Sequence, residues 1–248
     1  MQSHLSSPTL LLRDVADSRP VFFIHGMGGT AEEFLPVAQR VRTRRTMHAL
    51  RAKGGDGRSE PMNRIGDMAA FYLDTIKMLQ PEGPYTLIGF SLGGLAALEM
   101  TRILEGRGDS VDLLVMIDSY PFPKALPLWK KAKVAALKLK YGVQDAIGSR
   151  PSQDHPLPKA RARKRSEFFE FVALIDYQTR FYNGEIKFVR AADSEFPDPK
   201  AVWPSLAPGM KIEIVPGDHH SVLSKDCEPL AGLLSSYLEA DSPRKPPG

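Results

Sequence analysis

A serine flanked by glycines is the clearest chemical signal in this 248-residue sequence. Residues Gly89–Gly93 follow the pattern G-x-S-x-G, in which glycines allow a sharp turn that lifts the serine hydroxyl above a sheet. The pattern carries weight only where a strand precedes it and a helix follows it. The apolar residues 85–89 predict the strand and the largely apolar residues 92–104 predict the helix. We therefore expect Ser91 to act as a nucleophile.

A serine hydroxyl needs a base to accept its proton, and histidine is the usual base. His219 and His220 both follow the last predicted strand, which agrees with a chain order of serine, acid and histidine. Spacing alone does not choose between them. We expect His25, which precedes a glycine-rich loop, to stabilise that loop and not to act as the base.

Two aspartates compete for the carboxylate that orients this histidine. Asp118 follows the predicted strand 113–117, and Asp193 follows the predicted strand 186–190. Either residue would lie at the carboxyl edge of a parallel sheet, where active sites of this kind are built. Position alone leaves both candidates open.

The oxyanion that forms when the hydroxyl attacks needs hydrogen-bond donors, which backbone N–H groups supply in many enzymes. One donor is expected from Leu92, the residue after the nucleophile. The other is expected from Met27, in the glycine-rich segment 25–29.

The elements that must position these residues follow from hydrophobic periodicity. Short apolar runs predict strands at 21–25, 46–50, 85–89, 113–117, 186–190 and 212–215. Helical spacing predicts helices that contain residues 34–41, 65–79, 92–104, about 168–177 and 229–238. This alternation predicts an α/β fold with a mostly parallel sheet and helices on both faces.

One segment interrupts the alternation. Residues 122–183 contain proline-rich and basic stretches and are expected to form an insertion over the edge of the sheet. Between Lys124 and Arg165 there are twelve lysines and arginines against two acids, a net charge of +10 for that segment. We expect a single domain over residues 1–240 and a disordered tail at 241–248.

Composition narrows the class of protein. The net charge is only +4, and the hydrophobic content of 42% is ordinary for a globular protein. No apolar run approaches the length of a membrane helix, and no signal-peptide core is evident. The single cysteine, Cys227, cannot form an internal disulfide, in keeping with a cytoplasmic location. We expect neither a metal nor a cofactor, and the basic segment lacks a recognised nucleic-acid-binding module.

Six segments in order make the sequence resemble a known family, the thioesterase domains of polyketide and non-ribosomal peptide synthesis, which belong to the α/β-hydrolase superfamily. The resemblance covers about residues 21–238 and rests on Val21–Gly26, Gln80–Tyr85, Gly89–Gly94, Met116–Pro121, Phe181–Gly184 and Pro216–His219. It implies an α/β-hydrolase fold in which the insertion forms a mobile helical lid. It also favours Asp118, which begins an Asp-x-x-Pro segment, with Asp193 in reserve, and His219, which directly follows Gly-Asp.

The resemblance implies an activity as well. It predicts a serine hydrolase that cleaves an acyl chain from the phosphopantetheine of a carrier protein or from CoA, through an acyl-enzyme on Ser91. An acidic acyl or peptidyl carrier protein could dock on the basic insertion. The alternatives are an esterase or lipase-like hydrolase of oxygen esters and a non-catalytic acyl-binding member of the fold. The acyl chain, the choice between hydrolysis and cyclisation, and the pathway are not defined by the sequence.

Overall fold

The computed structural model describes residues 7–240 apart from 17, 29, 122–131, 133, 142–150 and 153. Its strands are β1 (Thr9–Arg13), β2 (Val21–Ile24), β3 (Met47–Leu50), β4 (Tyr85–Phe90), β5 (Val111–Ile117), β6 (Ile186–Ala191) and β7 (Met210–Val215). Its helices are η1 (Ala31–Phe34), α1 (Leu35–Arg40), α2 (Ile65–Leu79), α3 (Leu92–Gly106), α5 (Lys159–Asp176), α6 (Pro199–Val202) and α7 (Cys227–Ala240).

The strands form one seven-stranded sheet in the order β1-β3-β2-β4-β5-β6-β7. Strand β1 runs antiparallel to β3, and the other neighbouring strands pair in parallel. In the centre, Phe90 at the end of β4 pairs with Ile117 at the end of β5. The residues that follow these two strands therefore meet at the same carboxyl edge of the sheet.

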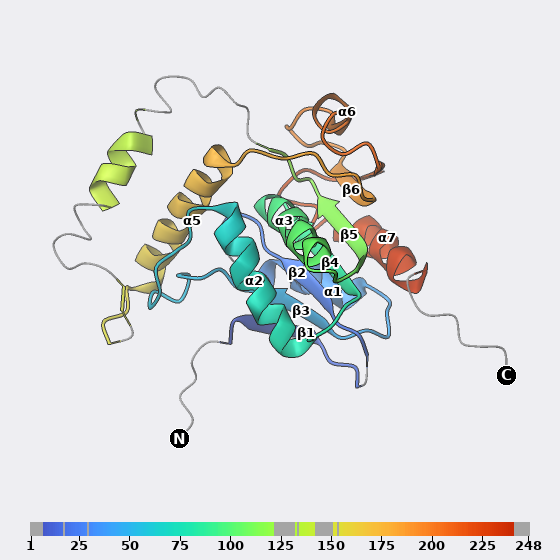
Figure 1. The fold of residues 1–248 in the computed structure, drawn as a ribbon, viewed down its shortest axis with the longest axis horizontal. Helices are drawn as coiled ribbons and strands as arrows, with labels where there is room; N and C mark the ends of the chain where they lie inside the picture. Colours follow the sequence, from blue (N-terminus) through green and yellow to red (C-terminus); the bar gives the residue numbers. More distant parts are fainter. Residues whose placement is uncertain are drawn as a thin grey trace.

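Side chains of one strand alternate between two hydrophobic layers. In β2, Phe22 and Ile24 face the layer that contains α2 and α3, whereas Val21 and Phe23 face the layer that contains α1 and α7. All four residues are buried, as expected for a parallel strand covered on both faces. Helices thus cover both faces of the sheet, and α2 and α3 lie side by side on one of them (Figure 1).

The predicted mostly parallel sheet with helices on both faces is confirmed, and every predicted strand and helix corresponds to an observed one. Besides a helical stretch at 134–141, two elements were missed. Strand β1 is formed by Thr9–Arg13, a short segment for which no strand was predicted. Helix α6 has four residues and begins after Asp198, whose carboxylate accepts a hydrogen bond from the Lys200 N–H.

Two helix predictions need correction. The helix predicted around 34–41 is divided into the 3-10 turn η1 and the short helix α1, with Pro36 in the first turn of α1. Helix α5 begins at Lys159, nine residues before the predicted start at about 168. Its early turns bury Ala162, Arg165 and Ser166, so they lack the apolar stripe that a helix prediction needs.

The segment predicted as an insertion lies between β5 and β6 and includes α5 and a helical stretch at 134–141. Much of the rest of it, and the predicted disordered tail at 241–248, fall outside the described residues.

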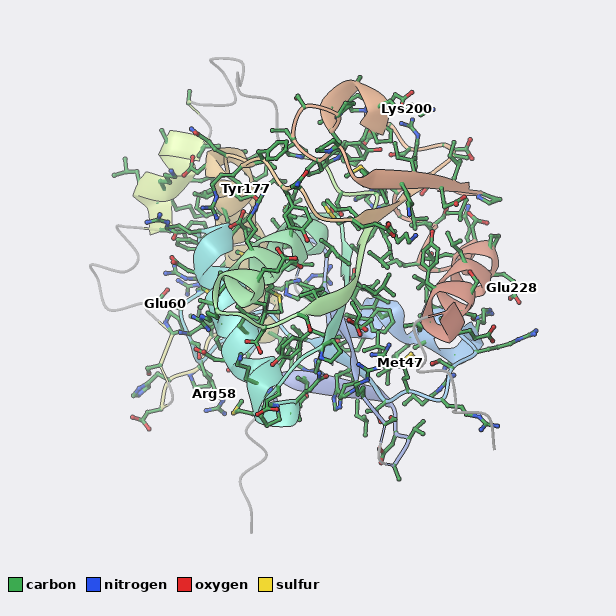
Figure 2. The ribbon with its side chains drawn as sticks, turned by 45° about the vertical axis from the view of Figure 1, so that its right-hand side comes forward. Met47, Arg58, Glu60, Tyr177, Lys200 and Glu228 are labelled. Atoms are coloured by element: carbon green, nitrogen blue, oxygen red, sulfur yellow. The ribbon has the colours of Figure 1, made fainter. Side chains whose placement is uncertain are left out.

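Helix α5 is held to the body of the protein near both ends. In its first half, Arg165 forms an ion pair with Glu60, with Nη2 and Oε2 2.9 Å apart. At its end, the hydroxyl of Tyr177 donates to Glu99 of α3 at 2.7 Å. Glu60 and Tyr177 lie on the same side of the molecule in Figure 2, away from Lys200. The position of α5 relative to the sheet is therefore fixed by polar contacts as well as by packing.

Within the part of the chain that the structure describes, no helix combines the length and apolar character needed to cross a membrane.

Candidate active site

Ser91 occupies a strained turn between β4 and α3. Its backbone has φ 53° and ψ −119°, and Ser91 and Asp118 are the two non-glycine residues with positive φ among those described. Glycines make this turn possible, because a Cβ on Gly89 would collide with the backbone of Gly93, and one on Gly93 with the Ile24 carbonyl. Positive φ costs free energy in a residue with a side chain and is concentrated at functional sites. The turn places Ser91 where the sequence predicts a nucleophile.

Asp118 is the first residue after β5 and is almost completely buried. Its backbone has φ 45°, and its N–H donates to the carbonyl of Val189 at 2.8 Å. Carboxylate oxygen Oδ2 accepts from Nδ1 of His219 at 2.7 Å and from the hydroxyl of Ser194 at 2.7 Å. The carboxylate is thereby fixed in one orientation, facing the histidine.

His219 lies in the loop between β7 and α7, with 13% of its side chain exposed. Its ring is stacked on Phe90 with centroids 4.8 Å apart and meets Phe196 edge-on at 4.9 Å. Because Nδ1 donates to the carboxylate of Asp118, Nε2 of the neutral ring is left to accept a proton. The arrangement is chemically suited to general-base catalysis next to Ser91.

Backbone contacts of Asp218 shape the loop that carries His219. Its carboxylate accepts the N–H groups of His220 and Ser221, both at 2.8 Å. These hydrogen bonds from Ser221 and His220 lower the pKa of Asp218. Gly217, with φ 102°, begins the turn in a conformation that favours glycine.

The alternative residues lie differently. Asp193 is exposed, and its described hydrogen bond is a backbone one, from its N–H to the carbonyl of Gly217. His220 is also exposed, with its ring centroid 5.4 Å from that of His219. Among the described residues, His219 is the histidine that hydrogen-bonds a candidate acid, and that acid is Asp118. No hydrogen bond joins Ser91 to His219 in this part of the chain. Catalytic hydrogen bonds to a serine are often long in unliganded enzymes.

The segment His25–Gly28 follows β2 and is called the oxyanion loop from here on, after the role that the sequence predicts for Met27. His25 is buried, and its Nδ1 lies 2.7 Å from the carbonyl oxygen of Gly26 while Nε2 lies 2.5 Å from the hydroxyl of Tyr72. A carbonyl oxygen can only accept, so Nδ1 carries the proton and Nε2 accepts from Tyr72. Burial raises the pKa of Tyr72 well above its ordinary value, which keeps this hydroxyl protonated. Both ring nitrogens of His25 are thus engaged in hydrogen bonds that stabilise the loop.

Two carboxylates accept backbone N–H groups of the same loop. Glu33 Oε1 accepts from the N–H of Gly26 at 2.7 Å, and Glu170 Oε2 accepts from the N–H of Gly28 at 2.6 Å. Burial raises the pKa of Glu33 to about 7; the hydrogen bond from Gly26 opposes this shift, and the charge of Glu170 adds to it.

The two predicted oxyanion donors belong to segments close to Ser91: Leu92 directly follows it, and Met27 follows Gly26, where an added Cβ would lie 3.5 Å from Cβ of Ser91. Leu92 is the first residue of α3, so its N–H has no acceptor within the helix and lies at the positive end of the helix dipole. Met27 lies between the two anchored glycines of the oxyanion loop, with a half-exposed side chain. That these two N–H groups bind the oxyanion formed at Ser91 stays a prediction.

Sequence reasoning did not identify three residues of this neighbourhood: Ser194, Glu33 and Glu170. Glu33 lies in the first turn of η1, outside every motif, and Glu170 lies in the interrupting segment, far from the motifs. No local pattern marks either residue as a partner of the oxyanion loop. Among the described residues, no group of three or more His, Cys, Asp and Glu side chains is arranged to hold a metal ion.

The fold and this site define an α/β-hydrolase: a mostly parallel sheet, a serine at a strained strand-to-helix turn, and an Asp–His pair at the same edge. Comparison with known proteins gives the family. The family model described as Thioesterase domain matches residues 19–236. The chain belongs to the thioesterase domain family, a class of hydrolases that act on thioesters, as its motifs predict.

Curated relatives are much longer than this chain. A dimodular nonribosomal peptide synthase of Bacillus subtilis (strain 168) is 36% identical over 146 residues, which are 57% of this chain and 6% of that protein. Polyketide synthase PksR of the same organism is 42% identical over 108 residues, 44% of this chain and 4% of that protein. The chain therefore matches only a small part of each multidomain relative.

Solved structures share the fold. The NocB thioesterase domain, in a covalent complex with a fluorophosphonate nocardicin G analog, superimposes with a TM-score of 0.69 at 22% identity, covering 93% of this chain and 98% of that chain. The type II thioesterase BorB from the borrelidin biosynthetic cluster gives a TM-score of 0.69 at 18% identity, covering 96% of this chain and 100% of that chain. These similarities confirm the α/β-hydrolase fold.

Proposed function

We propose that this protein hydrolyses acyl thioesters of polyketide or peptide biosynthesis through an acyl-enzyme on Ser91, with His219 as general base and Asp118 as the acid that orients it. The observation that carries the proposal is the 2.7 Å hydrogen bond between Asp118 and His219 at the sheet edge that holds the strained Ser91. Family membership supplies the substrate class, because the matched relatives are peptide and polyketide synthases.

In the acylation step, Nε2 of His219 takes the proton of the Ser91 hydroxyl as its oxygen attacks the thioester carbonyl carbon. The carbonyl oxygen becomes an oxyanion, which accepts hydrogen bonds from the N–H groups of Met27 and Leu92. When the intermediate collapses, the carbon–sulfur bond breaks and the imidazolium gives its proton to the thiolate. Asp118 stabilises the imidazolium and keeps the ring in the correct tautomer.

In the deacylation step, His219 takes a proton from water, whose oxygen attacks the acyl ester of Ser91. The second intermediate collapses, the Ser91 oxygen regains its proton from His219, and the free acid leaves. A hydroxyl or amine of the acyl chain in the place of water would give a ring by the same steps. No metal or cofactor takes part in this scheme; the acyl group arrives on the phosphopantetheine of a carrier protein or on CoA.

The carrier is the partner we propose, and the segment 122–183 is the lid on which it docks. Within α5, the side chains of Arg161, Arg163 and Lys164 are exposed, and one of them, Arg163, is paired with Glu167. Carrier proteins are commonly acidic, so this basic surface would attract one by charge complementarity. The single cysteine, Cys227, is buried and unpaired, which agrees with the cytoplasm as the site of the reaction.

Charge reversal on α5, assayed at low salt, tests the docking proposal. Arg161→Glu together with Lys164→Glu should raise KM for a carrier-bound thioester by about tenfold at low salt, while KM for a small free thioester stays unchanged. Lys200→Glu is the control, because Lys200 is exposed on α6, away from α5 (Figure 2). Equal effects of the two sets of variants on the carrier substrate would contradict docking on α5.

The function itself is tested with a panel of acyl-CoA, acyl-phosphopantetheine and p-nitrophenyl ester substrates. We expect the purified protein to prefer the thioesters and Ser91→Ala to abolish turnover without loss of folded structure. Ser236→Ala, which removes an exposed serine hydroxyl of α7, is the matched control and should retain full activity. Preference for oxygen esters would indicate an esterase, and no turnover would indicate an acyl-binding protein.

A further inference from the structure

The oxyanion loop is anchored on both sides of the peptide group that carries its donor. The Met27 N–H belongs to the peptide bond between Gly26 and Met27. The peptide before it donates through the Gly26 N–H to Glu33, and the peptide after it donates through the Gly28 N–H to Glu170. Because the two flanking peptides are fixed, rotation of the peptide between them is restricted.

The central peptide is held as well. Its carbonyl oxygen, that of Gly26, accepts from Nδ1 of His25, and in a trans peptide the N–H points away from the carbonyl. Three consecutive peptide groups of the loop are therefore oriented by side chains. Two of these side chains, His25 and Glu33, are close to the loop in the sequence, but Glu170 comes from α5, 142 residues away from Gly28.

Glu170 is an unusual residue to find buried. It is 2% exposed and accepts two hydrogen bonds, from the Gly28 N–H and from the hydroxyl of Ser166 at 3.0 Å. Within the described residues it has no lysine or arginine partner. Burying a carboxylate without a cation is costly, and hydrogen bonds to an ionised acceptor are stronger than those between neutral groups. A simple packing role would be served better by an apolar side chain.

We propose, on the basis of the proposed function of the site, that Glu170 is a positioning residue that aligns the Met27 N–H with the oxyanion when α5 is seated on the body of the protein. Glu33 performs the same task from η1. Helix α5 is seated by Arg165 on Glu60 and by Tyr177 on Glu99, so the contact with Gly28 links the position of this helix to the geometry of the oxyanion loop. A partner that shifts α5 would thereby change the rate of acyl transfer.

The chemistry limits the expected effect. Glu170 does not contact the substrate and acts through the loop, so its loss should lower kcat and leave KM for a small thioester nearly unchanged. Removal of an oxyanion donor costs about 100-fold to 1000-fold in kcat, and misalignment of a donor that is still present should cost less, about tenfold. Glu170→Gln keeps an oxygen that can accept the Gly28 N–H and should recover most of the rate.

The test combines kinetics with amide hydrogen exchange of a peptide that covers residues 24–30. Glu170→Ala should speed exchange in this peptide and lower kcat about tenfold, whereas Glu170→Gln should stay within about threefold of the parent protein. Glu167→Gln is the matched control. It removes a carboxylate of the same helix, one turn away, that also lies near Gly28 but is hydrogen-bonded to Arg163 and not to the loop backbone.

The combined exchange and kcat results either support or overturn the positioning role of Glu170. Faster exchange with lower kcat in Glu170→Ala alone supports the proposal. Unchanged exchange overturns it, as does faster exchange with an unchanged kcat, because either result separates the contact from catalysis. An equal loss in Glu167→Gln would assign the effect to charge and also overturn it. If the parent protein turns over no thioester at all, the proposed function fails with the catalytic role of Glu170, and exchange still reports whether the loop anchor exists.

Discussion

The two halves of the site are held in different ways. The Asp118–His219 half is built at the ends of adjacent strands, with β5, β6 and β7 and the loops that follow them supplying its contacts. The oxyanion loop depends on side chains from three separate helices: Tyr72 of α2, Glu33 of η1 and Glu170 of α5. The first half inherits the rigidity of the sheet. The second half can respond to whatever moves those helices.

This difference explains which parts of the site could be read from the sequence. Ser91 lies in a local motif flanked by a strand and a helix, and Asp118 follows a continuous apolar strand, so hydrophobic pattern and chain order predict their positions. The contacts of Glu33 and Glu170 depend on how helices pack on one another. A single sequence carries no signal for such contacts.

The elements of the fold also differ in how far the sequence predicts them. The central parallel strands β2 and β4 are buried at every residue, whereas the edge strand β1 is only partly buried and its five residues resemble any short apolar patch. The first turns of α5 bury an arginine that pairs with Glu60, so the helix was predicted to start only at about residue 168. A sequence pattern predicts a buried segment when the buried side chains are apolar. It does not predict one when the buried side chain is a charged residue with a partner distant in the sequence.

The largest expected effect comes from the rigid half. Asp118→Asn keeps the shape of the side chain but loses the charge that stabilises the imidazolium, and it can leave His219 in the wrong tautomer. We expect kcat to fall by about 1000-fold to 10,000-fold, with little change in the free energy of unfolding. Steady-state kinetics with a small thioester measure this.

The reserve acid provides the control for that prediction. Asp193→Asn should stay within about twofold of the parent protein, because Asp193 is exposed and contacts the site only through its backbone. A larger loss in Asp193→Asn than in Asp118→Asn would exchange the roles of the two residues.

In the oxyanion half, Glu33 should make the free energy of unfolding depend on pH. Because the pKa of Glu33 is raised from 4.5 to about 7, the folded state holds this proton more tightly than the unfolded state between these values. The free energy of unfolding therefore falls as the pH rises through this window. Glu33→Gln removes this dependence. From pH 4.5 to pH 8, its free energy of unfolding relative to that of the parent protein should rise by about 3 kcal/mol, measured by urea unfolding.

Glu32→Gln serves as the control for Glu33. Glu32 is exposed, adjacent in the sequence, and paired with Arg51. If the free energy of unfolding changes with pH in the same way in Glu33→Gln and in the parent protein, ionisation of Glu33 does not destabilise the folded state. That result would contradict the pH dependence expected for the oxyanion half.

A smaller effect is expected from Ser194, which donates its hydroxyl to the same carboxylate oxygen that His219 contacts. Ser194→Ala removes one of the groups that orient Asp118, and kcat should fall about fivefold, equivalent to about 1 kcal/mol, with KM unchanged. Ser224→Ala, which removes an exposed hydroxyl bound only to backbone carbonyls, is the comparison. A change in KM without a change in kcat would show that Ser194 affects substrate binding and not the acid.

The central claim is that Ser91 is the nucleophile and that His219 activates it. Intact-protein mass spectrometry of the reaction with a fluorophosphonate, followed by peptide mapping, tests this most directly. We expect one adduct, located on Ser91, absent in Ser91→Ala, and formed far more slowly in His219→Ala than in His220→Ala. An adduct on another residue, or equal rates in the two histidine variants, would contradict it.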